Sequence, residues 1–156
     1  MPVITRKQIV EQNSNTNSVA SLTLACSGTN QGNLLVMGVS VGSPPTAWTQ
    51  ISMPTGWLRG PFKKGSGTEP NAVEIWYYPN NPGGITSVVV TNTGANAVCR
   101  AILTEYIGVN PVNSWVGQGI ATGSTTSVSL RTATGGTVRV DDLLTVVVGA
   151  FRSSSP

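Results

Sequence analysis

Short apolar segments that recur along the chain, with glycine and proline between them, constrain its fold more than any other feature. The segments are rich in valine and threonine, and no long stretch has the apolar period of a helix. β-branched and aromatic side chains fit a pleated sheet, whereas Gly, Pro and Asn mark turns. The segments lie at residues 19–26, 34–41, 73–78, 87–92, 98–107, 127–131 and 143–151. The pattern predicts an all-β fold, an antiparallel β-sandwich that resembles a jelly roll.

The chain length and the first residues predict the domain organisation. A chain of 156 residues forms one domain with a core of its own. We predict that residues 18–156 form the sandwich and that residues 1–17 form an N-terminal arm. Within the arm, residues 5–12 are compatible with a short helix or with an extended segment, and the Asn-rich residues 13–17 read as a flexible lead. Segment 34–41 is apolar at nearly every position, so we expect a central strand that is covered on both faces.

Two long stretches carry no strand pattern. Residues 42–72 contain Trp48, Trp57 and Phe62, and they include a Lys-Lys tip that is bordered by glycine. Residues 108–124 contain Trp115. Loops of this length are usually functional or mobile. We therefore expect surface contacts from these two stretches.

The chain is poor in charge and has no histidine. Charged residues make up 10% of the sequence, and the acidic residues number six. Without histidine, no Ser-His or Cys-His nucleophile and no imidazole metal site can form. We therefore expect that the protein is not an enzyme and that it binds no metal or cofactor.

The positive net charge does not predict binding to nucleic acid. The formal charge is +3, but the nine basic residues are scattered along the chain. Nucleic-acid binding needs clustered positive charge that neutralises several neighbouring phosphates. The sequence also lacks the apolar run of a signal peptide or a membrane span. We expect synthesis in the cytoplasm and no membrane partner.

Four carboxylates invite a chemical interpretation. Glu74 and Glu105 lie beside aromatic residues, and a glycosidase needs two carboxylates that flank a sugar. The alternative, which we favour, makes each an outward strand residue or the partner of an arginine such as Arg100. Asp141 and Asp142 could contribute to a calcium site, although a turn before the next strand explains the pair more simply.

Cys26 and Cys99 are the only thiols, and both lie in apolar strand-like segments. They could form a disulfide. Two buried free thiols are the favoured interpretation, because a reducing cytosol keeps thiols reduced.

The large aromatic rings also allow two interpretations. On a sandwich, exposed rings beside Asn and Thr could stack on sugars. The favoured alternative places Trp76, Tyr78 and Tyr106 in the core and uses Trp57 to plug a loop, because aromatic side chains dominate cores and interfaces alike. Trp48 and Trp115 then remain as candidates for surface contacts.

A set of motifs resembles a known type of module. They are Gly32-Asn33-Leu34-Leu35-Val36-Met37, Pro54-Thr55-Gly56-Trp57, Val73-Glu74-Ile75-Trp76-Tyr77-Tyr78 and, after a Ser/Thr/Val strand, Ala101-Ile102-Leu103-Thr104-Glu105-Tyr106-Ile107-Gly108-Val109 with Pro111-Val112. Their order over residues 19–151 resembles a β-sandwich module of tailed-phage virion proteins and of some secreted bacterial repeat proteins. Longer members continue beyond the position of Pro156, so this chain is either a shorter variant or part of a longer protein. If it is a shorter variant, the last strand is expected to leave a sheet edge that a neighbouring subunit can pair with.

The resemblance implies a virion structural protein. We expect a capsid decoration (cement) protein that acts as a homo-oligomer, in particular a trimer, and that binds the major capsid protein in the assembled shell. The alternative is a receptor- or carbohydrate-binding module of a tail fibre or spike. In either case the protein belongs to the virion and is made in the host cytoplasm.

The candidate partner-binding residues come from the arm, from the loop at residues 60–67 and from the two loop tryptophans. The Lys63-Lys64 pair reads as a solvated tip or, alternatively, as a grip on an acidic partner. The complete set is Arg6, Lys7, Ile9, Trp48, Phe62, Lys63, Lys64 and Trp115.

Overall fold

The computed structural model describes residues 3–15, 18–42, 51–64, 71–93 and 96–109. These residues form eight strands and no helix, and hence no helix that could span a membrane. The strands are β1 (Thr5–Asn13), β2 (Ser21–Ala25), β3 (Leu34–Gly42), β4 (Ile51–Ser52), β5 (Leu58–Lys64), β6 (Asn71–Tyr78), β7 (Ser87–Asn92) and β8 (Val98–Ile107).

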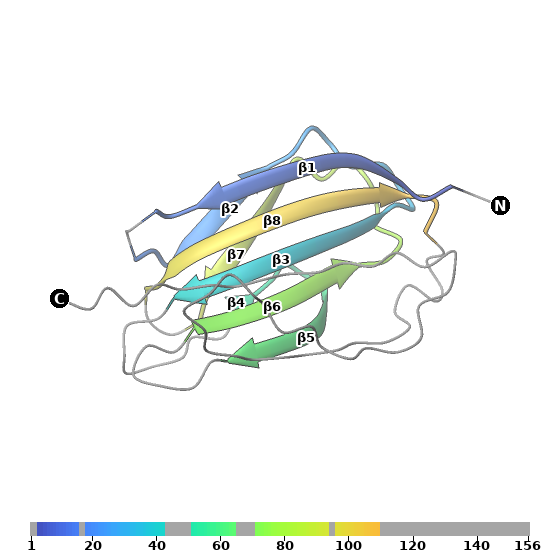
Figure 1. Cartoon of the computed structure of the whole chain (residues 1–156). Coiled ribbons are helices and arrows are strands. Elements are labelled where there is room, and N and C mark those ends of the chain that lie inside the picture. The colour runs from blue at the N-terminus through green and yellow to red at the C-terminus, as the bar shows by residue number, and fades with distance from the viewer. Residues whose placement is uncertain (1–2, 16–17, 43–50, 65–70, 94–95, 110–156) are drawn as a thin grey trace, which may run out of the picture.

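The strands form two antiparallel sheets, which confirms the predicted all-β sandwich. The five-stranded sheet has the order β1-β8-β3-β6-β5, and the three-stranded sheet has the order β2-β7-β4. In Figure 1 the five-stranded sheet lies in front, and β2, β7 and β4 cross behind it. A jelly roll pairs strands 1, 8, 3 and 6 in one sheet and strands 2, 7, 4 and 5 in the other. The order here differs only in β5, which pairs with β6 instead of β4.

The core lies between the two sheets. β3 is the central strand of the larger sheet, and Leu35, Met37, Val39 and Val41 are fully buried on its inner face. Leucines and valines of β2 and β7 pack against them from the smaller sheet. The other face of β3 is buried as well, with Leu34 and Val36 at 5% and 6% exposure. The expectation that segment 34–41 is a central strand covered on both faces is therefore confirmed.

The structure corrects the predicted N-terminal arm. Thr5–Asn13 is a strand of the five-stranded sheet, paired with β8 from Thr5↔Ile107 to Asn13↔Arg100. The helical alternative for residues 5–12 is therefore wrong. These residues are extended, but they form an edge strand of the sheet and not an arm. Residues 5–13 therefore belong to the five-stranded sheet, where β1 pairs along one side of β8.

The structure also corrects the irregular stretch 42–72. Leu58–Lys64 forms β5, so most of the predicted 60–67 loop belongs to an edge strand. The turn before β5 depends on Gly56, which has a φ of 96°. A Cβ at this position would lie 2.4 Å from the Tyr78 ring, so only glycine allows the turn to approach β6. The Gly-Trp motif thus has a packing reason.

Candidate functional site

Glu105 is a fully buried carboxylate on the inner face of β8. The side chain of Gln8 donates a hydrogen bond to it (2.5 Å), and the Lys7 ammonium lies 3.4 Å away. The backbone N–H of Asn30 and the side-chain amide of Asn33 donate to its other oxygen, at 2.8 and 2.7 Å. Burial alone raises the pKa of this carboxyl, but the hydrogen bonds and the Lys7 charge outweigh burial, and the pKa lies below its ordinary value.

Asn81 holds the loop that supplies two of these donors. Its buried side chain donates to the carbonyls of Asn30 (3.0 Å) and Asn33 (2.7 Å). Its oxygen accepts hydrogen bonds from Thr29 and from the N–H of Gly83, both at 2.9 Å. The turn after β6 therefore fixes the loop before β3, and that loop in turn fixes Glu105.

Glu74 is a second fully buried carboxylate, on the inner face of β6. Arg59 of β5 binds it in a bidentate manner, with distances of 3.2 and 3.0 Å. The indole N–H of Trp76 donates a third hydrogen bond at 2.9 Å. The same guanidinium lies over the ring of Phe62, 4.0 Å from its centre. The Arg59–Glu74 ion pair thus links the edge strand β5 to β6.

Glu74 and Glu105 are both enclosed by the fold. Each has no exposed surface and is held by donors of the fold. Each was expected to be an outward strand residue or the partner of an arginine such as Arg100. The arginine alternative is confirmed for Glu74, whose partner is Arg59, whereas Glu105 is buried and pairs with Lys7. Arg100 pairs with Glu11 on the surface.

Both thiols are free, as the favoured interpretation held, with Cys99 buried and Cys26 partly buried. Burial raises the pKa of each thiol, and hydrogen bonds from Gly28 and Asn92 offset this only in part. Both therefore remain protonated at neutral pH and are poor nucleophiles. Among the described residues, no three His, Cys, Asp or Glu side chains are grouped as a metal site. Asp141 and Asp142 lie outside those residues.

Exposed apolar side chains lie on or next to the two edge strands of the five-stranded sheet. Of the six large apolar residues that are exposed in the described part, Ile9 lies on β1, and Leu58 and Phe62 lie on β5. Val3 precedes β1, Ile107 ends β8 opposite Thr5, and Val89 lies on β7. The β1 margin consists of Val3, Arg6, Ile9, Tyr106 and Ile107. The β5 margin consists of Leu58, Phe62, Lys63 and Lys64.

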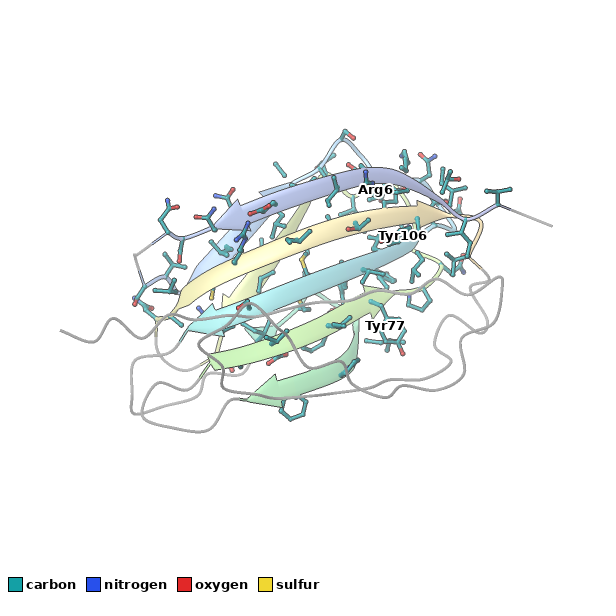
Figure 2. The ribbon with its side chains drawn as sticks, viewed as in Figure 1. Arg6, Tyr77 and Tyr106 are labelled. Atoms are coloured by element: carbon teal, nitrogen blue, oxygen red, sulfur yellow. The ribbon has the colours of Figure 1, made fainter. Side chains whose placement is uncertain are left out.

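The β1 margin contains a cation without a carboxylate. The three described carboxylates pair with Lys7, Arg59 and Arg100, so Arg6 forms no ion pair with a described carboxylate. Arg6 lies opposite Tyr106 in the sheet and is exposed. Figure 2 shows both residues on the outer face, which also carries Tyr77 of β6.

The predicted contact residues divide into three groups. Arg6 and Ile9 are exposed on the β1 margin, and Phe62 is exposed on the β5 margin. Lys7 is engaged within the chain by Glu105, by the carbonyl of Gly28 and by Asn30, and its contact with a partner stays a prediction.

The remaining predicted residues are only partly described or not described. Lys63 and Lys64 belong to β5, opposite Val73 and Ala72, rather than to a loop tip, and their side chains are not described. Trp48 and Trp115 lie outside the described residues.

The favoured interpretation of the aromatic residues is confirmed for three rings. Trp57 is buried, and Trp76 and Tyr78 pack against the core cluster. The ring centres of Trp57 and Tyr78 are 5.8 Å apart. Tyr106 differs, because it lies on the outer face of β8. The alternation of side chains along β8 predicts this position, since Glu105 and Leu103 occupy the opposite face.

One pocket lies at the end of the sandwich where the Gly-Trp turn meets β6 and β7. It has a volume of about 300 Å³. Its lining contains no charged residue and consists of Pro54, Thr55, Trp57, Tyr78, Pro82, Ile85, Ser87 and Val88.

Comparisons of the chain with protein-family models, with curated proteins and with solved structures found no match.

Proposed function

We propose that the protein is a structural component of a tailed-phage virion, a capsid decoration protein that binds the major capsid protein and stabilises the assembled shell. It acts without catalysis and as a homo-oligomer, for which a trimer is the first expectation. Binding to the assembled state alone stabilises that state by mass action, by about 2.7 kcal/mol per site at a concentration of 100 times the Kd.

The observation that carries this proposal is the distribution of exposed apolar side chains. Three of the six that the described residues contain lie on the edge strands β1 and β5, and two more, Val3 and Ile107, lie beside the start of β1. The described carboxylates are meanwhile engaged in ion pairs, two of them inside the fold. Apolar edges that carry cations suit contacts with neighbouring protein subunits, whereas no described group is placed to act on a substrate.

The β5 margin is the proposed contact with the shell. Leu58 is 48% exposed on the outer face, and Phe62 is 43% exposed on the inner face. The two following residues of the strand are lysines, so the sequence of the margin combines apolar and basic residues. A capsid surface that contacts it is expected to present an apolar patch with acidic neighbours.

Co-sedimentation with shells tests the proposal. The probe is the major capsid protein encoded in the same genome, supplied as assembled shells and, separately, as dissociated subunits. We expect binding to shells, little binding to subunits, and shells that resist heat better when decorated. Leu58→Lys should weaken shell binding at least about tenfold, whereas Val89→Lys, at an exposed apolar residue of the other sheet, should not. Absence of shell binding by the unmodified protein would reject the proposal.

The pocket beside Trp57 supports a second candidate, a carbohydrate-binding module of a tail fibre or spike. Aromatic rings and the hydroxyls of Thr55 and Ser87 suit an uncharged sugar ring. A monosaccharide panel that changes tryptophan fluorescence would support it. The response should then be lost in Ser87→Ala, while the thermal unfolding of the variant stays close to that of the parent protein.

A further inference from the structure

The free edge of β1 has the features of a self-pairing strand. β1 spans nine residues and forms one edge of the five-stranded sheet. The other described edges are less suited to pairing. β4 has two residues, β2 has five, and β5 contains Pro61. Proline offers no N–H to a new neighbour.

The outer face of β1 carries Arg6, Ile9 and Glu11 in succession. Their partners on β8 are Tyr106, Thr104 and Ile102, which are evenly spaced at every second residue. The register shift between Arg6 and Gln8 accommodates one additional residue, Lys7, whose ammonium is bound to Glu105. Arg6 and Glu11 therefore lie equally far from Ile9 along the strand, although Arg6 is three residues away in the sequence and Glu11 is two.

This spacing is self-complementary. When two β1 strands pair antiparallel about a two-fold axis at Ile9, the two Ile9 side chains lie opposite each other. Arg6 of each copy then lies opposite Glu11 of the other. Opposite charges directly across an antiparallel pair are favourable, as are paired apolar side chains. The side chain of Ile9 is 52% exposed in the single chain, so the pairing covers apolar surface.

The charges of the described chain fit this pairing. Arg6 has no ion pair with a described carboxylate, and among the described cations Glu11 is bound to Arg100 at the surface. The Glu11 carboxylate is 42% exposed in that pair and can accept a second guanidinium. The described part of β1 presents no other charge on its outer face, so nothing on it opposes the pairing.

We propose that two copies of this chain associate through their β1 edges, with Ile9 on the two-fold axis and Arg6–Glu11 ion pairs on both sides of it. The two five-stranded sheets become continuous across the interface. This inference rests on the self-association in the proposed function, but it replaces the expected trimer with a two-fold dimer and does not depend on the capsid as partner. A contact of nine residues per chain is small, so we expect a Kd in the micromolar range, on the order of 1–100 μM.

Charge reversal tests the proposal. The native mass is measured by light scattering and by sedimentation from about 1 μM to about 1 mM protein, for the unmodified chain, Arg6→Glu, Glu11→Arg and the double variant R6E/E11R. Each single variant places like charges opposite each other twice and should weaken the dimer at least about tenfold. The double variant restores two opposite-charge pairs and should dimerise like the unmodified chain. An equimolar mixture of the two single variants should also dimerise, because each contact then joins an acid to a base.

Three controls make the outcome decisive. Val89→Lys should leave the mass unchanged, and high salt should weaken the dimer of the unmodified chain. Thermal unfolding of each variant shows whether a lower native mass reflects dissociation or unfolding. Arg6→Glu remains interpretable even if Glu11→Arg is destabilised beside Arg100.

A monomer at all concentrations, a trimer insensitive to every substitution, or a double variant that fails to recover would overturn the proposal. A monomer that still binds shells would reject this pairing and leave the proposed function in place, whereas a dimer that ignores shells would do the reverse.

Discussion

At both margins of the five-stranded sheet, an ion pair with a buried glutamate holds the edge strand to its neighbour. At each margin, the edge strand sends one cation to the inner face, where it meets a fully buried glutamate on the neighbouring strand. Lys7 of β1 meets Glu105 of β8, and Arg59 of β5 meets Glu74 of β6. A register shift lies beside the cation in both edge strands. Each ion pair thus anchors an edge strand whose regular ladder is interrupted.

The margins differ in how many groups share the charge. Glu105 accepts three hydrogen bonds from neutral donors, two of them on a loop that Asn81 holds, so Lys7 is one donor among several. Glu74 depends on the bidentate Arg59 and on the single indole N–H of Trp76. A buried charge is costly unless it is paired and hydrogen-bonded. Glu74 and Glu105 are therefore equally buried but depend on their counter-ions to different degrees.

Removal of the two cations should produce the largest difference. Arg59→Met leaves Glu74 buried with one donor, and we expect the free energy of unfolding to fall by about 3–5 kcal/mol. Lys7→Met leaves Glu105 with three donors, and we expect a loss of about 1–2 kcal/mol. Urea denaturation monitored by tryptophan fluorescence measures both. Equal losses in the two variants would contradict the argument from shared donors.

Glu105→Gln should have the next largest effect, about 2–3 kcal/mol at neutral pH, because an amide donor then faces the amide of Gln8 and the Lys7 ammonium. The variant also tests pH dependence. The pKa of Glu105 in the folded protein lies below its ordinary value, which is about 4.3 in an unfolded chain. Its stabilising contribution is therefore fully present above that value and is lost as the pH falls through the folded pKa. Unfolding free energies from pH 7 to pH 3 should fall less steeply for Glu105→Gln than for the unmodified chain.

Much of the fold could be predicted from alternation, and the exceptions have local causes. The predicted segments 87–92 and 98–107 coincide with β7 and β8. β1 was missed because the additional residue Lys7 breaks the period of two and because most of its side chains are polar. β5 was missed because Gly60 and Pro61 read as loop residues. Irregular edge strands lack the clean period on which such a prediction depends.

The buried carboxylates could have been predicted from the same alternation. Cys99, Ala101, Leu103 and Glu105 share one face of β8, and three of the four are small or apolar. The expectation that charge faces solvent outweighed this signal. The partner of each glutamate could not be predicted, because Lys7 and Arg59 reach them only through strand pairings between residues far apart in the sequence. Arg6 and Ile9 were identified as contact residues, whereas their relation to Glu11 required the register of β1.

Removal of one neutral donor from each glutamate should have a smaller effect. Trp76→Phe removes the indole N–H from Glu74, and we expect a loss of about 2 kcal/mol, which includes some packing. Asn33→Ala removes one of four donors from Glu105, and we expect about 1 kcal/mol. The double variants Arg59→Met with Trp76→Phe and Lys7→Met with Asn33→Ala extend the comparison. Coupling between the two changes should be larger at Glu74, where no other donor remains. Additive losses at Glu74 would show that the two donors act independently.

The ion pair between Glu11 and Arg100 is exposed, in contrast to the two buried glutamates. Glu11→Ala should change the free energy of unfolding by less than about 1 kcal/mol, because water solvates both groups and salt screens them. The same substitution removes the acid that lies opposite Arg6 of a second copy, so self-association should weaken although the single chain remains stable. Arg100→Ala provides the matched control, since it breaks the same intrachain pair and keeps Glu11. If both variants dimerise equally well, the exposed glutamate serves only its own chain, and if only Glu11→Ala loses the dimer, the contribution of this surface charge lies between chains.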